Sequence, residues 1–213
     1  MNRRFLRHVL TCSALYLAAL GLAVPGSALD ANPKFTKATT GSTVTVDHSA
    51  WDKLLKTYVV PGTDGLNRVA YGRMKAAHPA LKGYVAALEK VDPATLDKPE
   101  QFAFWVNLYN AKTIDVVLDK YPVKSIKEVS LGGGLKSLVT GGPWQGKIMK
   151  VSGVELSLDD IENTILRPIH KDPRVHYTVN CASVGCPNHI TQCLSWSAWN
   201  RKNIRCPIVK SPI

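Results

Sequence analysis

The sequence predicts a mixed α+β domain, with a central buried helix packed with a small mixed or antiparallel sheet and surrounding helices. One long segment, residues 100–120, is apolar nearly all round, which is typical of a helix buried at the centre of a domain. Alternating segments at 147–156 and 175–179 predict short strands. The chain has 213 residues, of which 45% are hydrophobic, so it is large enough for one domain with a core of its own.

The first residues have the order of a secretory signal peptide. Three arginines precede an apolar run at 9–25, and small residues at 26–28 follow it as a cleavage site. An uncleaved anchor fits less well, because the run is about 17 residues long, at the lower limit for a membrane span. We therefore expect residues 1–28 to be removed, the protein to be periplasmic or secreted, and no transmembrane segment to remain.

The charge excludes one class of partner. The formal net charge is +11, and loss of the three N-terminal arginines leaves +8. Four of these charges lie within residues 188–213, a segment without acids, so the preceding domain is only mildly basic. Its basic residues are spread out and do not interleave with aromatics, so we do not expect nucleic acid as a partner. A small molecule, a peptide or a protein remains possible as the partner.

The mature chain begins with a polar segment. Residues 29–48 are rich in Thr, Lys and Gly and predict a flexible, extended lead-in to a globular domain at 49–188. Helical spacing predicts helices at 51–60 and 79–91, and the turn cluster at 61–65 separates them.

The next elements have clear boundaries. A short strand is expected at 66–71. Pro99 stands just before the central helix, and Pro122 stops it.

The second half of the domain starts with a hairpin. Ser152 and Gly153 predict a tight turn between two strands. Ser157 and Asp160 have the spacing of a capping box, so a helix is expected to start there. Residues 175–179 are β-branched and alternate, which predicts a strand that leads into a cysteine-containing segment.

Three polar residues interrupt the central helix. Glu100, Asn107 and Asn110 are spaced i, i+7 and i+10, so they share one side of it. Amides in an apolar helix need hydrogen-bond partners. They either bond neighbouring backbone, such as a loop end that crosses the helix, or orient a catalytic group or a substrate.

Cysteine usage follows from the expected compartment. Cys12 leaves with the signal peptide, and Cys181, Cys186, Cys193 and Cys206 remain. Disulfides are the default in an oxidising compartment.

The segment 180–187 allows several interpretations. Cys181 and Cys186 could form a disulfide, or Cys181 could be a thiolate nucleophile stabilised by backbone N–H groups at the strand end. A metal site that adds His176 and His189 is a third possibility, although the spacing is not a standard zinc pattern, and two inert buried thiols are a fourth. The spacing also differs from that of thioredoxin-like motifs.

His176 is the candidate base. On the expected strand it lies on one face with Thr178 and Asn180. If that face lines a pocket, His176 could accept the proton of a thiol. A histidine on a strand is also common as a core or edge residue. The sequence has no phosphate-binding loop, no GxSxG and no HExxH, so we expect no cofactor and no catalytic metal.

Five ordered motifs together resemble one family. They are 100–111 (EQFAFWVNLYNA), 121–126 (YPVKSI), 156–162 (LSLDDIE), 172–177 (DPRVHY) and 180–183 (NCAS) with Cys186 and Pro187 after it. The chain is similar over about residues 50–188 to the domain-of-unknown-function family 547. The family occurs in exported bacterial proteins and in multidomain plant and animal proteins. The resemblance implies a family but no reaction.

The C-terminal end departs from the family. Members usually continue with a polar amphipathic helical stretch, whereas residues 189–213 form an atypical basic tail with two further cysteines and no acid. We interpret this tail as the product of a frameshift or truncation. The other reading frames of the downstream DNA would test this hypothesis.

Two functional hypotheses follow. In the first, the domain is a thiol-dependent hydrolase or acyl transferase, in which Cys181 is the nucleophile, His176 the base, and Glu100, Asn107 and Asn110 orient them. In the second, it is a non-catalytic binding or interaction domain that a Cys181–Cys186 disulfide stabilises.

Overall fold

The computed structural model describes residues 30–123, 129 and 143–182. The chain divides into two compact units, residues 1–30 and 31–213, and all the elements described below lie in the second. The expected signal peptide and the basic tail lie outside the described residues. Within the described part of the chain, no helix is both long enough and apolar enough to span a membrane.

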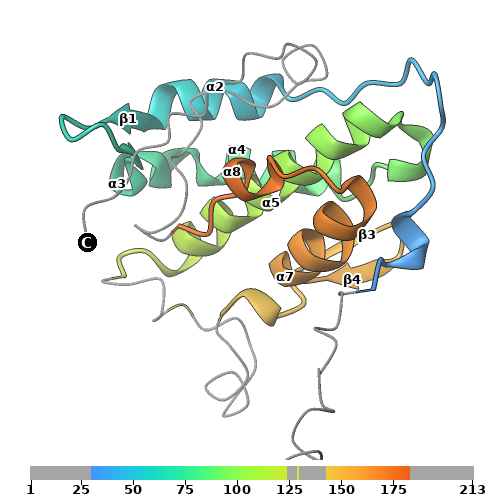
Figure 1. Ribbon diagram of the computed structural model, residues 1–213. Helices are drawn as coiled ribbons and strands as arrows, with labels where there is room; N and C mark the ends of the chain where they lie inside the picture. The colour runs from blue at the N-terminus through green and yellow to red at the C-terminus, as the bar shows by residue number, and fades with distance from the viewer. Residues whose placement is uncertain (1–29, 124–128, 130–142, 183–213) are drawn as a thin grey trace, which may run out of the picture. The chain divides into compact units, whose positions relative to one another are not determined.

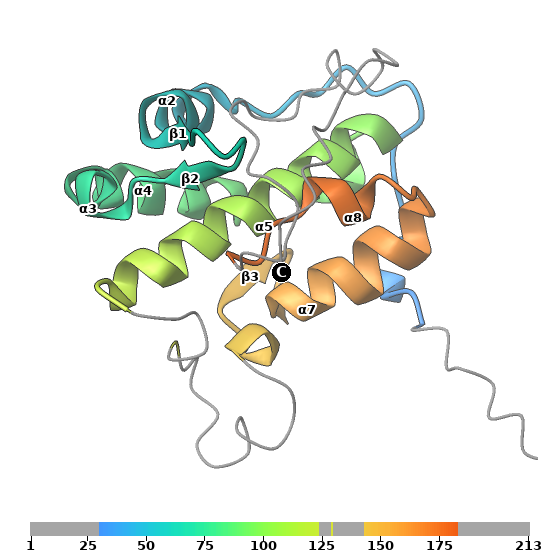
Figure 2. The same ribbon diagram turned by 60° about the vertical axis from the view of Figure 1, so that its left-hand side comes forward.

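Helix α5 (Lys98–Lys120) is the centre of this unit (Figures 1 and 2). Its start is capped by Asp97, whose Oδ1 accepts the N–H of Glu100 at 3.0 Å, and it ends where the extended backbone of Tyr121 leads into Pro122. Nearly every side chain from Glu100 to Leu118 is buried, and α5 packs against helix α4 (His78–Leu88) and helix η6 (Ile161–His170). The central buried helix predicted from the sequence is confirmed.

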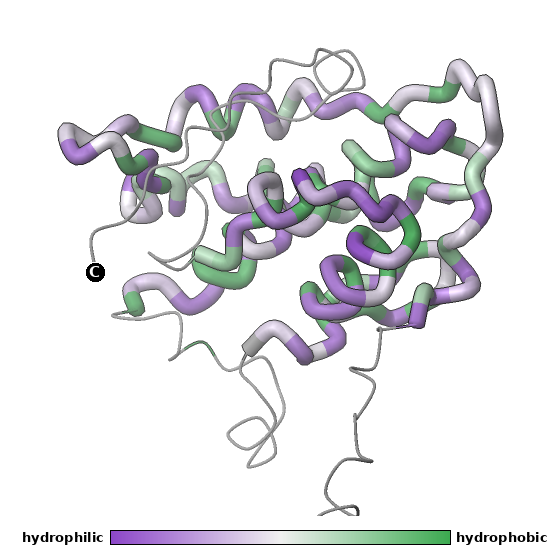
Figure 3. Tube along the Cα trace, viewed as in Figure 1, coloured by the Kyte–Doolittle hydropathy of each residue, from purple (hydrophilic) through white to green (hydrophobic). Residues whose placement is uncertain are grey.

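Shorter helices surround α5. They are η1 (Pro33–Phe35), α2 (Ser49–Tyr58), α3 (Tyr71–Met74), η2 (Lys75–Ala77), η3 (Pro93–Thr95), η5 (Pro143–Gln145), α7 (Leu158–Asp160) and α8 (Val175–Thr178). Polar and apolar residues alternate along α2 in Figure 3, and its buried side chains Trp51, Leu54 and Leu55 have the expected helical spacing. The ring of Trp51 is nearly parallel to that of Tyr84 in α4, with centroids 6.0 Å apart, which joins the two helices.

The strands form two separate antiparallel pairs. Strand β1 (Val59–Pro61) pairs with β2 (Asn67–Val69), with Val59 opposite Val69. Strand β3 (Met149–Val151) pairs with β4 (Val154–Leu156), with Met149 opposite Leu156. The described part of the chain is therefore an α+β domain, as predicted.

The hairpin turn and the capped helix start predicted after β3 are both present. Ser152 and Gly153 have φ values of 47° and 81°, the left-handed backbone that a tight hairpin requires. Ser157 and Asp160 form a full capping box, in which Ser157 Oγ accepts the N–H of Asp160 at 3.0 Å and Asp160 Oδ2 accepts the N–H of Ser157 at 2.6 Å. Helix α7 continues directly as η6, which is a π-helix.

The strand predicted at 175–179 is wrong, because Val175–Thr178 is the short helix α8. Asp172 initiates it: its Oδ1 accepts the N–H of Arg174 at 2.9 Å, and its carbonyl accepts the N–H of Val175 at 3.1 Å. The described residues pair no other strand with this segment. Alternation of β-branched residues does not form a strand without a partner strand.

Candidate functional site

The polar side chains of α5 hold chain segments that cross the helix. Asn110 bonds the backbone at two points: its Nδ2 donates to the carbonyl of Thr178 at 2.8 Å, and its Oδ1 accepts the N–H of Asn180 at 2.9 Å. Asn110 is 4% exposed, so both bonds are shielded from water. One of the two explanations given for these amides was a bond to a loop end that crosses the helix. Asn110 makes such a bond.

Glu100 and Gln101 do the same at the start of α5. Glu100 Oε1 accepts the N–H of Val46 at 2.8 Å, and Gln101 Nε2 donates to the carbonyls of Lys37 at 2.7 Å and Pro93 at 3.0 Å. Both side chains are buried. The lead-in expected at 29–48 is thus bonded to α5 in two places. We did not single out Gln101 from the sequence, although a glutamine within an apolar helix is itself a signal of a buried polar contact.

Asn107 is fully buried within α5. It therefore lies inside the core, between the two groups of contacts made by Glu100 and Asn110, and does not line the surface.

Cys181 follows the segment that Asn110 holds. Asn180 is 6% exposed, and its Oδ1 accepts the N–H of Ala182 at 2.8 Å, which forms a turn around Cys181. Ala182 has φ of 57°, a left-handed conformation that is uncommon for a residue with a Cβ. Cys181 is partly exposed, whereas Cys186 lies outside the described residues.

His176 is not on a common face with Thr178 and Asn180, as the predicted strand required. It is exposed on α8, whereas Thr178 and Asn180 are buried. Its ring meets that of Tyr177 edge-on, with centroids 5.3 Å apart. The reason is the helix: a helical turn rotates successive side chains by about 100°, so residues two apart do not share a face.

A charged cluster joins α4 to the second half of α5. His78 Nε2 lies 2.7 Å from Asp115 Oδ1, Lys112 Nζ lies 2.9 Å from Asp115 Oδ2, and Lys82 Nζ lies 2.8 Å from Asp119 Oδ1. Burial raises the pKa of Asp115, but hydrogen bonds from Lys112 and His78 and the charges of Lys112 and Lys82 outweigh it, so the pKa lies below its usual value.

The same cluster has metal-binding residue types. One ligand atom each from His78, Asp115 and Asp119 lies within 4.8 Å of the others. The ammonium groups of Lys82 and Lys112 already bond these carboxylates, so a cation would have to displace them. The arrangement fits an ion-pair network better than a metal site.

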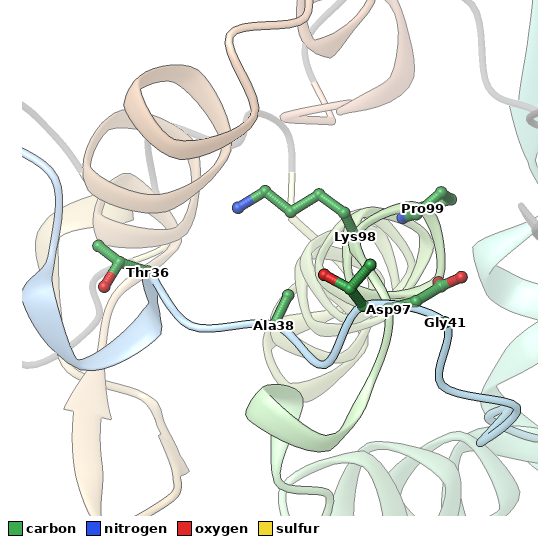
Figure 4. A pocket seen from close by; sticks show the side chains of 7 residues that line it. Thr36, Ala38, Gly41, Asp97, Lys98 and Pro99 are labelled. Atoms are coloured by element: carbon green, nitrogen blue, oxygen red, sulfur yellow. The ribbon is translucent and has the colours of Figure 1, made fainter.

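An open pocket of about 420 Å³ lies between the lead-in and the first turn of α5 (Figure 4). The residues that line it are Thr36, Ala38, Thr40, Gly41, Asp97, Lys98 and Pro99. Burial lowers the pKa of the Lys98 ammonium. None of the site residues predicted from the sequence lines this pocket.

Comparisons with known proteins identify a family and nothing finer. Residues 93–195 match the model of a family described as "Protein of unknown function, DUF547", which confirms the resemblance seen in the motifs. The match begins at the short helix before α5 and includes α8 and Cys181. No curated protein and no solved structure matches the chain.

Proposed function

Because residues 93–195 belong to the DUF547 family, we propose that the chain is an exported member of it that acts by binding a partner, not by thiol catalysis. The proposed compartment is the periplasm or the cell exterior, and the proposed export signal is residues 1–28. The partner is a small molecule, a peptide or a protein.

The observation that carries this proposal is the hydrogen bonding of Asn110. A residue that orients a nucleophile or a substrate must direct a polar atom to it. Both polar atoms of the Asn110 amide instead bond the backbone of Thr178 and Asn180, and the side chain is buried. Asn110 therefore acts as a structural clamp that fixes the segment before Cys181.

Glu100 supports the same interpretation. Its carboxylate accepts a backbone N–H from Val46 and is 5% exposed, so it holds the lead-in in place. The proposed base, His176, is exposed on a helix, and no neighbouring carboxylate of the described residues orients its ring by a hydrogen bond. A catalytic histidine normally has such a partner.

In this proposal Cys181 and Cys186 form a disulfide. A bond between them closes a very short loop that starts at the turn held by Asn110 and Asn180. On the chain-entropy model a loop of this length stabilises the fold by about 2 kcal/mol. The bond would form in the oxidising compartment to which the protein is proposed to be exported.

The alternative remains the thiol-dependent hydrolase or acyl transferase, with Cys181 as nucleophile and His176 as base. The two functions predict opposite states of one sulfur atom. A nucleophilic cysteine has to be reduced, accessible and more acidic than an ordinary thiol, whereas a cysteine in a structural disulfide is oxidised and unreactive.

Alkylation of the purified protein without reductant, followed by peptide mass spectrometry, distinguishes them. We expect Cys181 and Cys186 to resist labelling at every pH tested and to be recovered as one linked peptide. The variant Cys186→Ser is the control, since it should make Cys181 reactive at an ordinary thiol rate. Fast labelling of Cys181 below pH 7 in the unmodified chain would replace the binding proposal with the enzyme.

Export is tested separately. Fractionation of producing cells should place the mature protein outside the cytoplasm, with an N-terminus just after Ala28. A product that keeps residues 1–28 in the cytoplasm would contradict the proposal.

A further inference from the structure

His48 connects the lead-in to the core and is buried at the junction. The residue is 6% exposed, and its carbonyl accepts the N–H of Asp52 in the first turn of α2. Two residues earlier, the N–H of Val46 is bonded to Glu100 of α5. His48 is therefore the last residue of the lead-in, and like Phe35 before it, it is enclosed by the core.

The ring of His48 has one hydrogen-bond partner for two nitrogens. Nδ1 lies 2.6 Å from Tyr84 Oη of α4, whereas Nε2 is buried without a partner among the described residues. A neutral imidazole fits this site because a single hydrogen bond to Tyr84 is enough to orient it. A protonated ring would have two N–H donors and only one acceptor, so one donor would be buried unpaired.

The charged groups near the ring do not compensate for its burial. Asp47 is the neighbouring acid, but its carboxylate is on the surface and accepts the N–H of Ser49. The carboxylate of Asp52 in α2 is ion-paired with Lys56, and that of Glu100 in α5 is engaged by the N–H of Val46. From α4 the ring contacts the neutral hydroxyl of Tyr84. Burial lowers the pKa of His48 to about 4, and the attraction of Asp47 opposes this only in part.

The segment next to His48 is weakly held. Residues 40–47 are exposed or half-exposed, and Val44 is 51% exposed. Between Thr39 and Ser49, the described hydrogen bonds to α4 and α5 are those from Val46 to Glu100 and between His48 and Tyr84. Helix α2, by contrast, is anchored by the buried side chains of Trp51, Leu54 and Leu55. If the site of His48 opens, the lead-in side will therefore move before the helix.

We propose that His48 is an acid-sensitive latch: protonation of its ring releases residues 40–48 from α4 and α5 and uncovers the carboxylate of Glu100. The latch is closed at neutral pH, where the ring is uncharged. It opens as the pH falls, because the released ring binds a proton that the buried ring does not. This inference does not depend on the binding proposal or on the state of Cys181.

Hydrogen exchange of the full chain measures the opening directly. The His48 ring has an ordinary histidine pKa in the open form and a pKa of about 4 in the closed form. The equilibrium constant for opening of residues 40–47, corrected for the intrinsic exchange rate, should therefore rise about 30-fold from pH 7.5 to pH 5. Amides of α5 report global unfolding, which also exposes the buried ring of His170, so their exchange is analysed separately from that of residues 40–47.

Two variants separate the latch from a general acid effect. His48→Gln keeps an acceptor for Tyr84 but cannot be protonated, so it should abolish the pH dependence of exchange at 40–47. His176→Gln removes an exposed histidine and should leave that dependence unchanged. Equal pH dependence in the unmodified protein and in His48→Gln would overturn the proposal.

A measurement on the unmodified protein covers the case in which His48→Gln does not fold. The NMR titration of the His48 ring should have its midpoint near pH 4. A His48 midpoint above pH 6 would show that the closed form accepts the proton, and the latch would be excluded.

Discussion

The side-chain oxygen of Asn110 accepts a hydrogen bond from the backbone N–H of Asn180 at 2.9 Å, across a separation of 70 residues. Together with the bond to the carbonyl of Thr178, it joins the central helix to the segment that carries Cys181. Other buried polar groups hold further elements together in the same way.

Replacement of Asn110 by alanine should destabilise the domain by about 2–4 kcal/mol, because it leaves a buried N–H and a buried carbonyl without partners. Chemical denaturation followed by circular dichroism measures the change. Thr113→Val is the matched control on the same helix. Among the described residues, the Thr113 hydroxyl bonds only the carbonyl of Tyr109, within α5, so its loss should cost less than about 1 kcal/mol. Equal losses in the two variants would show that the clamp contributes no special stability.

Asp115→Asn should destabilise the domain by about 2–3 kcal/mol, since the buried carboxylate neutralises Lys112 and bonds His78. Asp119→Asn, in the next turn of α5, removes a carboxylate that is 45% exposed and should cost less than about 1 kcal/mol. Urea denaturation of both variants at neutral pH gives the comparison. A larger loss for Asp119→Asn would contradict the assignment of Asp115 as the centre of the cluster.

His170 should make the domain less stable in acid. Burial and then the charge of Lys98 lower the pKa of His170 from 6.5 to about 4. The folded form thus binds a proton less readily than the unfolded form, so this contribution to stability is complete above pH 6.5 and is lost as the pH falls toward 4. At pH 5 the loss is about 2 kcal/mol.

The variant His170→Gln tests this assignment by denaturation at pH 7.5 and pH 5. It should reduce the difference between the two pH values, whereas His176→Gln, at an exposed site, should not. If His170→Gln has the same pH dependence as the unmodified chain, the buried imidazole is not its source.

Ser157→Ala should destabilise the start of α7 by about 1 kcal/mol, because Ser157 Oγ accepts the N–H of Asp160. Asp160→Asn should weaken the reciprocal bond to the N–H of Ser157 and remove the ion pair to Lys147. Thermal unfolding of the single and double variants measures the coupling between the two residues. Strictly additive losses of stability would show that the two reciprocal hydrogen bonds of the capping box are not coupled.

Much of this domain could be predicted from the sequence because the determining interactions are local. The capping box of Ser157 and Asp160 spans four residues, and the turn at Ser152 and Gly153 needs only two residues that accept a left-handed backbone. The length and apolar character of 100–120 likewise indicated a buried helix before any partner was known.

The strand predicted at 175–179 shows where local patterns are insufficient. Alternating β-branched residues stabilise a strand only when a neighbouring strand accepts the backbone hydrogen bonds. Among the described residues none pairs with this segment, and the turn set by Asp172 forms a helix instead. As a result, His176 was predicted to share a face with Thr178 and Asn180, whereas it is exposed on α8.

Local sequence patterns specify the central helix, the second hairpin and the capped helix start, because each depends on residues close together in the chain. The contacts of Glu100, Asn110 and His48 follow from the folded arrangement alone, since their partners are 54, 68 and 36 residues away. A buried polar side chain must find a partner, but its residue type does not specify which one. The packing of α5 against the crossing segments determines which backbone groups these side chains bond, and it places Thr178 and Asn180 against Asn110.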